Sequence, residues 1–95
     1  MNKHANQTTL RVREPEFSAI TEIVDSRTDL FDFEKINSKT YVLTFKSIEK
    51  AEELDEMIKY QLTYRGFNID YEPNEFGRIC EYLIDKFYAI LLTKI

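Results

Sequence analysis

The sequence is poor in cysteine, histidine and tryptophan. It contains one cysteine, one histidine and no tryptophan. A single cysteine cannot form a bridge within the chain, and the first residues do not resemble an export signal, so we expect a cytoplasmic protein. His4 falls in the polar segment 1–7, which we predict to be a mobile N-terminal tail. A mechanism that depends on histidine is therefore not expected.

The sequence motifs of common binding sites are also missing. The chain has no cysteine and histidine cluster for zinc and no phosphate loop of the GxxxxGK(S/T) or GxGxxG type. Its longest uncharged apolar run, Phe87 to Leu92, is far shorter than the roughly 20 residues of a membrane helix. Cys80 lies on a predicted apolar helix face, where a thiol is usually an inert core residue. We predict a protein that is not an enzyme, takes no metal or cofactor, and does not enter the membrane.

Glycine and proline are scarce, with two residues of each. This scarcity argues against disorder and against long linkers. Apolar residues make up 43% of the chain and aromatic residues 14%, which is enough for a dense core. A fold of this size buries roughly 65% of the surface that its unfolded chain exposes. We predict one domain, which covers residues 8–95.

The net charge of −4 is unevenly distributed. Residues 1–46 carry seven basic and seven acidic side chains, whereas residues 47–95 carry six basic and ten acidic side chains. The excess negative charge therefore lies in the second half. Phosphate backbones repel such a protein at long range, so we do not expect nucleic-acid binding without a local basic patch.

The first half of the chain has the two-residue alternation of β-strands. The segment 8–12 alternates Leu10 and Val12 with polar residues, and the segments 30–36 and 40–45 alternate on either side of a predicted turn at Asn37 and Ser38. Only one side of each strand is apolar. We therefore predict an antiparallel sheet with one packed face and one polar face.

From Ser47 the pattern becomes helical. Ser47 is a good N-cap for a helix that should end at Gly66 in the left-handed conformation, with Phe67 folded back on Leu62. A short strand or extended connector is predicted after it, at residues 67–72. A second helix follows Pro73, and its apolar stripe covers about half of a helical cylinder.

Residues 15–25 fit either a helix or a strand. Pro15 and the spacing of Phe17, Ile20 and Val24 favour a helix, whereas the density of β-branched residues favours a strand. A helix gives a ferredoxin-like βαββαβ order plus a C-terminal helix, in which three helices compete for one sheet face. We favour the strand. The predicted fold is α+β, with an antiparallel sheet of three to four strands packed on one face by two long C-terminal helices.

The first long helix carries acidic residues where a helix would gain from lysine. Glu49 and Glu53 are four positions apart, as are Glu52 and Glu56, and like charges at this spacing repel. A solvated face explains them, but so does a docking patch for a basic surface on a larger protein. The predicted partner-binding residues are Glu49, Glu52, Glu53, Glu56, Tyr60 and Tyr64. An inhibitor, an adaptor or a nucleic-acid mimic would use such a patch.

Two further surfaces are predicted. A nucleic-acid-binding module that uses the polar sheet face is the alternative function, and its basic residues would be Arg11, Arg13, Lys39 and Lys46. The apolar stripe of the last helix is wider than the roughly 100° that one core requires. We therefore predict a homodimer interface, which includes Tyr88, Leu92 and Ile95.

Overall fold

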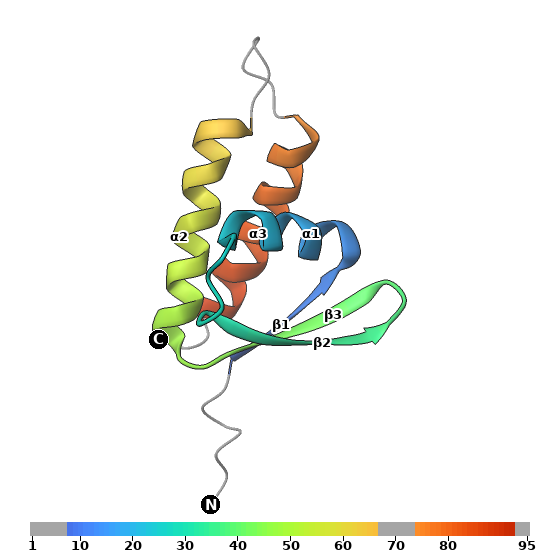
Figure 1. Cartoon of the computed structure of the whole chain (residues 1–95). Coiled ribbons are helices and arrows are strands. Elements are labelled where there is room, and N and C mark those ends of the chain that lie inside the picture. The colour runs from blue at the N-terminus through green and yellow to red at the C-terminus, as the bar shows by residue number, and fades with distance from the viewer. Residues whose placement is uncertain (1–7, 67–73, 93–95) are drawn as a thin grey trace, which may run out of the picture.

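The fold combines a three-stranded antiparallel sheet with three helices that lie on one side of it (Figure 1). The computed structural model describes residues 8–66 and 74–92. The elements in chain order are β1 (Thr8–Arg13), α1 (Glu14–Val24), β2 (Phe31–Asn37), β3 (Thr40–Phe45), α2 (Ile48–Arg65) and α3 (Glu75–Leu92). This architecture confirms the predicted α+β class. Within the described ranges, no helix has the combination of length and hydropathy that membrane crossing requires.

The sheet has the strand order β1-β3-β2. Leu43 on the central strand lies opposite Leu10 of β1 and Phe33 of β2. The predicted hairpin between β2 and β3 is confirmed, and the backbone N–H of Lys39 donates to Oδ1 of Asn37 in its turn, at 2.8 Å. The side-chain carbonyl oxygen of Asn37 thus accepts a hydrogen bond that a backbone carbonyl oxygen would otherwise accept in the turn.

Residues 14–24 form a helix, so the strand that we favoured for residues 15–25 is wrong. The backbone N–H of Arg13 donates to Oε1 of Glu16 at 2.8 Å, and Pro15 stands in the first turn, where its missing N–H is not needed. Ile20 and Val24 are buried one helical turn apart. The order of elements through α2 is that of the ferredoxin-like alternative. The strand predicted at 67–72 lies outside the described residues.

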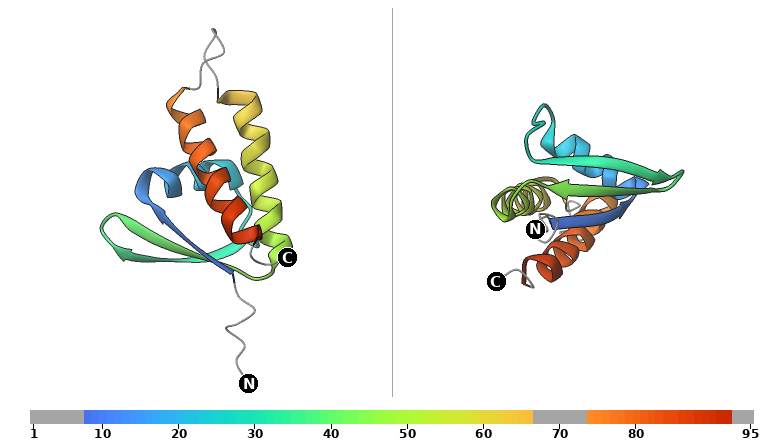
Figure 2. Two further views of the ribbon diagram at one scale, coloured as in Figure 1. Left: turned by 180° about the vertical axis from the view of Figure 1, so that it is seen from behind. Right: turned by 90° about the horizontal axis from the view of Figure 1, so that it is seen from below.

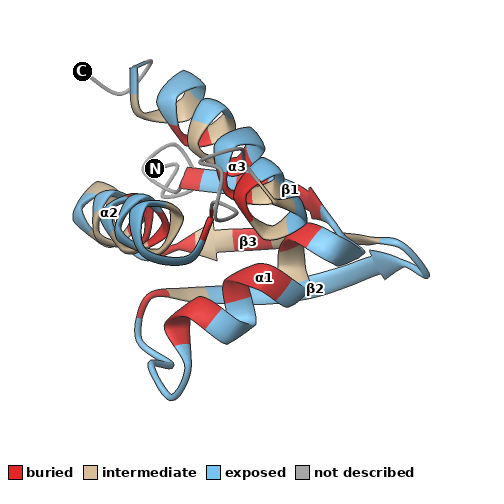
Figure 3. Ribbon diagram, turned by 90° about the horizontal axis from the view of Figure 1, so that it is seen from above, coloured by how far each residue is buried: buried red, intermediate tan, exposed pale blue. Residues whose placement is uncertain are grey.

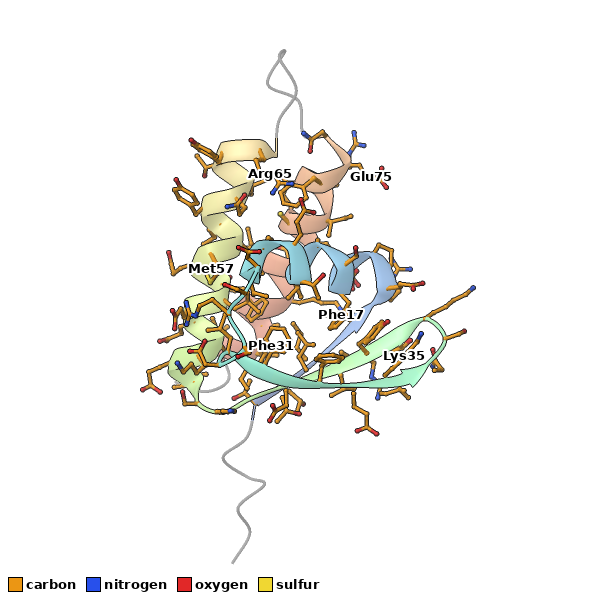
Figure 4. The ribbon with its side chains drawn as sticks, in the orientation of Figure 1. Phe17, Phe31, Lys35, Met57, Arg65 and Glu75 are labelled. Carbon is orange, nitrogen blue, oxygen red and sulfur yellow. The ribbon has the colours of Figure 1, made fainter. Side chains whose placement is uncertain are left out.

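The three helices share one sheet face because they do not lie side by side on it. In Figures 1 and 2, α1 runs along the sheet, while α2 and α3 rise away from it next to each other. Phe17 points from α1 onto the hairpin and stacks on Tyr41 with ring centroids 3.9 Å apart (Figure 4). Phe87 of α3 meets Phe45 of the central strand edge to face at 5.7 Å. The competition for space that disfavoured a third helix is therefore absent.

The C-terminal helix contributes to the core, as its apolar stripe predicts. Cys80, Leu83 and Phe87 are fully buried, which confirms the predicted burial of the thiol. Tyr88 and Leu92 of the same helix stay exposed. The stripe is therefore divided between a core-facing part and a part that no described residue covers.

The far ends of α2 and α3 meet at the two glycines of the chain. Gly66 has a φ of −87°, so the predicted left-handed ending is wrong, and its N–H continues the helix to the Leu62 carbonyl oxygen at 2.9 Å. Glycine is needed instead for the close approach of the two helix ends, because a methyl group on Gly77 would overlap the carbonyl of Gly66. Oδ1 of Asn74 caps α3 by accepting the Gly77 N–H at 2.8 Å. The predicted contact of Phe67 with Leu62 lies outside the described residues.

Candidate functional site

The predicted docking residues lie along one exposed side of α2. Ser47 caps this helix by accepting the Lys50 N–H at 3.2 Å, as predicted. The opposite side of the helix is buried in the core. Figure 3 shows this division of α2 into buried and exposed sides. The side chains brought to the exposed side are those of Glu49, Glu52, Glu56, Tyr60 and Tyr64, with Glu53 half-buried beside them.

Tyr60 and Tyr64 form an aromatic pair on this surface. Their ring centroids are 5.4 Å apart and their planes differ by 18°, so the rings are stacked. They remain 61% and 75% exposed. Large rings at such exposure are typical of contact surfaces because they supply apolar area with few rotatable bonds.

A shallow groove of about 320 Å³ runs beside these residues, between α1 and α2. Its apolar lining comes from Ile23 of α1 and Met57 of α2. Glu53, Glu56 and Tyr60 surround this apolar lining together with a glutamine. The groove therefore combines an apolar floor with an acidic and aromatic rim.

Ion pairs hold α1 and the segment after it against α2. Arg27 contacts Glu53 at 2.9 Å and Asp29 at 2.8 Å, and its hydrogen bond holds the pKa of Asp29 far below the usual range. Glu22 contacts Arg65 at 2.8 Å farther along the helices. The first of these contacts also relieves the repulsion between Glu53 and its acidic neighbours. Glu56, 3.8 Å from Lys59 at its nearest, is the more available carboxylate on the rim.

The polar sheet face carries charges of both signs. Arg11 of β1, Val42 of β3 and Glu34 of β2 lie opposite one another in one row across the sheet. Asp32 is on the same face as Glu34, whereas Arg13 is on the same face as Arg11. The central strand presents Thr40, Val42 and Thr44 there, so it offers no ring on which a base could stack. Lys39 lies in the hairpin turn and Lys46 follows β3. The arrangement adds no support for the nucleic-acid alternative.

A second and smaller hollow lies between α2 and α3. This cleft of about 170 Å³ is lined by Asp55, Lys59, Ile84, Tyr88, Leu91 and Leu92. Nζ of Lys59 contacts Oδ2 of Asp55 at 2.9 Å, and this hydrogen bond raises the pKa of Lys59. Two of the predicted dimer residues, Tyr88 and Leu92, thus line the same cleft, whereas Ile95 lies outside the described residues. The sequence does not single out Asp55, because it lies in a run of acidic residues that is typical of a solvent-exposed helix face.

A third hollow, of about 410 Å³, lies between the end of α1 and β2. It mixes the carboxylates of Asp25 and Asp32 with the rings of Phe31 and Phe33. Its one basic side chain, Arg27, is engaged by Asp29 and Glu53. The lining therefore offers no convergent set of groups for one ligand.

Reactive groups are few in the described part of the chain. Burial raises the pKa of the Cys80 thiol to about 11, so the thiol is protonated at neutral pH. No group of three or more histidine, cysteine, aspartate or glutamate residues in residues 8–66 and 74–92 is arranged to hold a metal ion. Comparisons with protein-family models, curated proteins and solved structures found no match.

Proposed function

We propose that this chain is a non-enzymatic protein-docking module of the cytoplasm that binds a basic segment of a larger protein. The observation that carries the proposal is the groove between α1 and α2, where the apolar floor of Ile23 and Met57 is bordered by Glu53, Glu56 and Tyr60. An inhibitor or an adaptor acts through such a surface without chemistry of its own.

The three parts of the groove have separate physical roles. The floor and the Tyr60 ring supply apolar area, which determines how slowly a bound segment leaves. The carboxylates attract a basic segment from a distance and select it over acidic ones. A hollow of about 320 Å³ holds one or two side chains, so the partner is expected to insert an apolar anchor that is flanked by lysine or arginine.

The acidic row on α2 also fits a nucleic-acid mimic, as a special case of the same proposal. Glu49, Glu52 and Glu56 are exposed along one helix, and a basic nucleic-acid-binding surface is the kind of partner that such a row attracts. The net charge of −4 repels nucleic acid itself.

The test is affinity capture from the native host with groove variants and a matched control. The groove variant is Glu56→Lys with Tyr60→Ala, and the control is Glu81→Lys with Tyr82→Ala on α3, which makes the same changes at two other exposed positions. We expect a basic protein that the parent chain and the control retain and that the groove variant loses. Equal retention by all three chains would contradict the proposal.

Kinetics with the captured protein then separate the two roles. Glu56→Lys should slow association and weaken its dependence on salt, because the carboxylate acts at a distance. Tyr60→Ala should speed dissociation by about tenfold, as the loss of a central aromatic contact does. Melting curves of both variants should match that of the parent, since both side chains are exposed.

A further inference from the structure

The cleft between α2 and α3 contains a buried carboxylate oxygen that lacks a partner. Asp55 is 5% exposed, and Oδ2 of its carboxylate contacts Lys59 at 2.9 Å. Its other oxygen, Oδ1, is buried without a hydrogen bond. Buried polar atoms are rarely left in this condition, because the loss of hydration is not offset. Asp55 lines the cleft, so its carboxylate offers one unfilled acceptor, which a donor that enters the cleft reaches once the carboxylate turns about its side-chain torsion.

The size and lining of the cleft specify the donor further. A hollow of about 170 Å³ is large enough for one aromatic ring, and the side chains of Ile84, Leu91 and Leu92 make its lining apolar. The ammonium group of Lys59 stands beside Asp55 and repels a second cation. The fitting group is thus a neutral hydrogen-bond donor on an aromatic ring, which is the chemistry of a phenol.

Such a phenol stands at the cleft itself. Tyr88 lines the cleft and is nevertheless 67% exposed, and Leu92 beside it is 54% exposed. A surface that holds both a phenol and a phenol-sized hollow with an acceptor is complementary to itself. Self-complementary patches are what two-fold dimers use, because each copy offers the same surface to the other.

We propose that two copies of this chain form a two-fold dimer in which Tyr88 of each copy enters the α2–α3 cleft of the other and donates to Oδ1 of Asp55. The two hydrogen bonds satisfy both buried carboxylates at once. The exposed part of the α3 stripe, including Leu92, is covered in the same step. The dimer leaves the groove between α1 and α2 open, since different residues line that groove.

The test is sedimentation equilibrium of the full chain from about 10 μM to about 1 mM, a range that brackets weak dimers. The parent chain should show a monomer–dimer equilibrium. Tyr88→Ser should be monomeric throughout. Tyr88→Phe keeps the ring but loses two hydrogen bonds to charged acceptors per dimer, so its dissociation constant should rise by about a hundredfold. Tyr82→Ser, at another exposed tyrosine of α3, should dimerise like the parent.

Two further measurements locate the association. The methyl NMR signals of Ile84 and Leu91 should shift with protein concentration in the parent and stay fixed in Tyr88→Ser, while the ring signals of Tyr64 stay fixed in both. Para-cresol, a free phenol with the chemistry of the tyrosine ring, should compete with dimerisation. Melting curves establish that each variant is folded.

Three results would overturn the proposal. A parent chain that is monomeric at the highest concentration excludes the dimer, and para-cresol binding to that monomer would assign the cleft to a small phenol instead. A dimer that survives Tyr88→Ser places the interface elsewhere. Loss of dimerisation in Tyr82→Ser as well would show a general effect of removing aromatic area from α3.

Discussion

Helix α2 borders two hollows that differ in how charge is placed in them. On the α1 side, an open groove has carboxylates on an exposed rim above an apolar floor. On the α3 side, a cleft of about half that volume encloses one carboxylate that is almost fully buried. Exposed charges act on a partner at a distance and are weakened by salt, whereas a buried oxygen acts only on a donor in contact with it. The groove is therefore suited to select partners by charge, and the cleft by shape.

The largest expected effect comes from a change that removes the packing of α3 on the sheet. Phe87→Ala takes away the ring that packs α3 on Phe45, and we expect the free energy of unfolding to fall by about 4 kcal/mol. Urea denaturation measures this loss. Tyr82→Ala on the same helix is the control, because this exposed ring lines neither hollow and its removal should change the value by less than about 0.5 kcal/mol. Similar losses in the two variants would show that this face of α3 is not core.

A second substitution should affect the cleft side of α2 alone. Gly77→Ala forces a methyl group against the carbonyl of Gly66, so α2 and α3 must separate at their far ends. We expect a loss of about 2 kcal/mol in the free energy of unfolding. Arg78→Ala changes the next, exposed position of the same helix and serves as the control. A Gly77→Ala chain with the urea midpoint of the Arg78→Ala chain would exclude a tight contact between the glycines.

The ion pairs on the two sides of α2 provide the most direct comparison. Lys59→Met leaves the buried Asp55 carboxylate without its partner, and the free energy of unfolding should fall by about 1 kcal/mol. Arg27→Met removes two contacts in which all side chains are well exposed, so its effect should be smaller. Thermal melts of the two variants, recorded in low and high salt, measure both effects. A larger loss of stability in Arg27→Met than in Lys59→Met would mean that burial of the carboxylate does not decide the strength of these ion pairs.

The last effect is absent at neutral pH and appears only in alkaline solution, where Cys80 contributes a pH dependence. Its pKa of about 11 in the folded chain exceeds the roughly 8.5 of a free thiol. The unfolded chain therefore loses the thiol proton first, and stability should decline between about pH 9 and about pH 11. Urea midpoints at these two pH values should differ less for Cys80→Ala than for the parent. An equal decline in both chains would assign the pH dependence to other groups.

Most elements of the fold were predictable because their signals are local. The hairpin follows from alternation on both sides of Asn37, and α2 follows from the cap at Ser47. The α1 segment was assigned wrongly because Ile20, Ile23 and Val24 favour a strand by propensity alone. Tertiary packing decides in favour of the helix, since α2 and α3 stand upright and leave sheet surface for α1.

The same limit applies to the candidate site. The placement of Glu56 and Tyr60 on one side of α2 follows from helical geometry alone. The groove floor at Ile23, the ion pair of Glu53 with Arg27, and the burial of Asp55 all need contacts between elements that are distant in the sequence. No local pattern contains that information.

The contacts of Asn74 determine where the chain can be lengthened. Its backbone N–H reaches the Gly66 carbonyl at 2.9 Å and its side chain reaches the Arg65 carbonyl at 2.9 Å, so the residues that flank 67–73 are held together by hydrogen bonds of their own. A longer connection between them would keep these two hydrogen bonds and would cost loop-closure entropy of about 0.6 kcal/mol for each doubling of its length. This connection joins the ends of α2 and α3 that lie farthest from the sheet (Figure 1). It is the natural insertion point for a fluorescent or affinity reporter that leaves both hollows of α2 accessible.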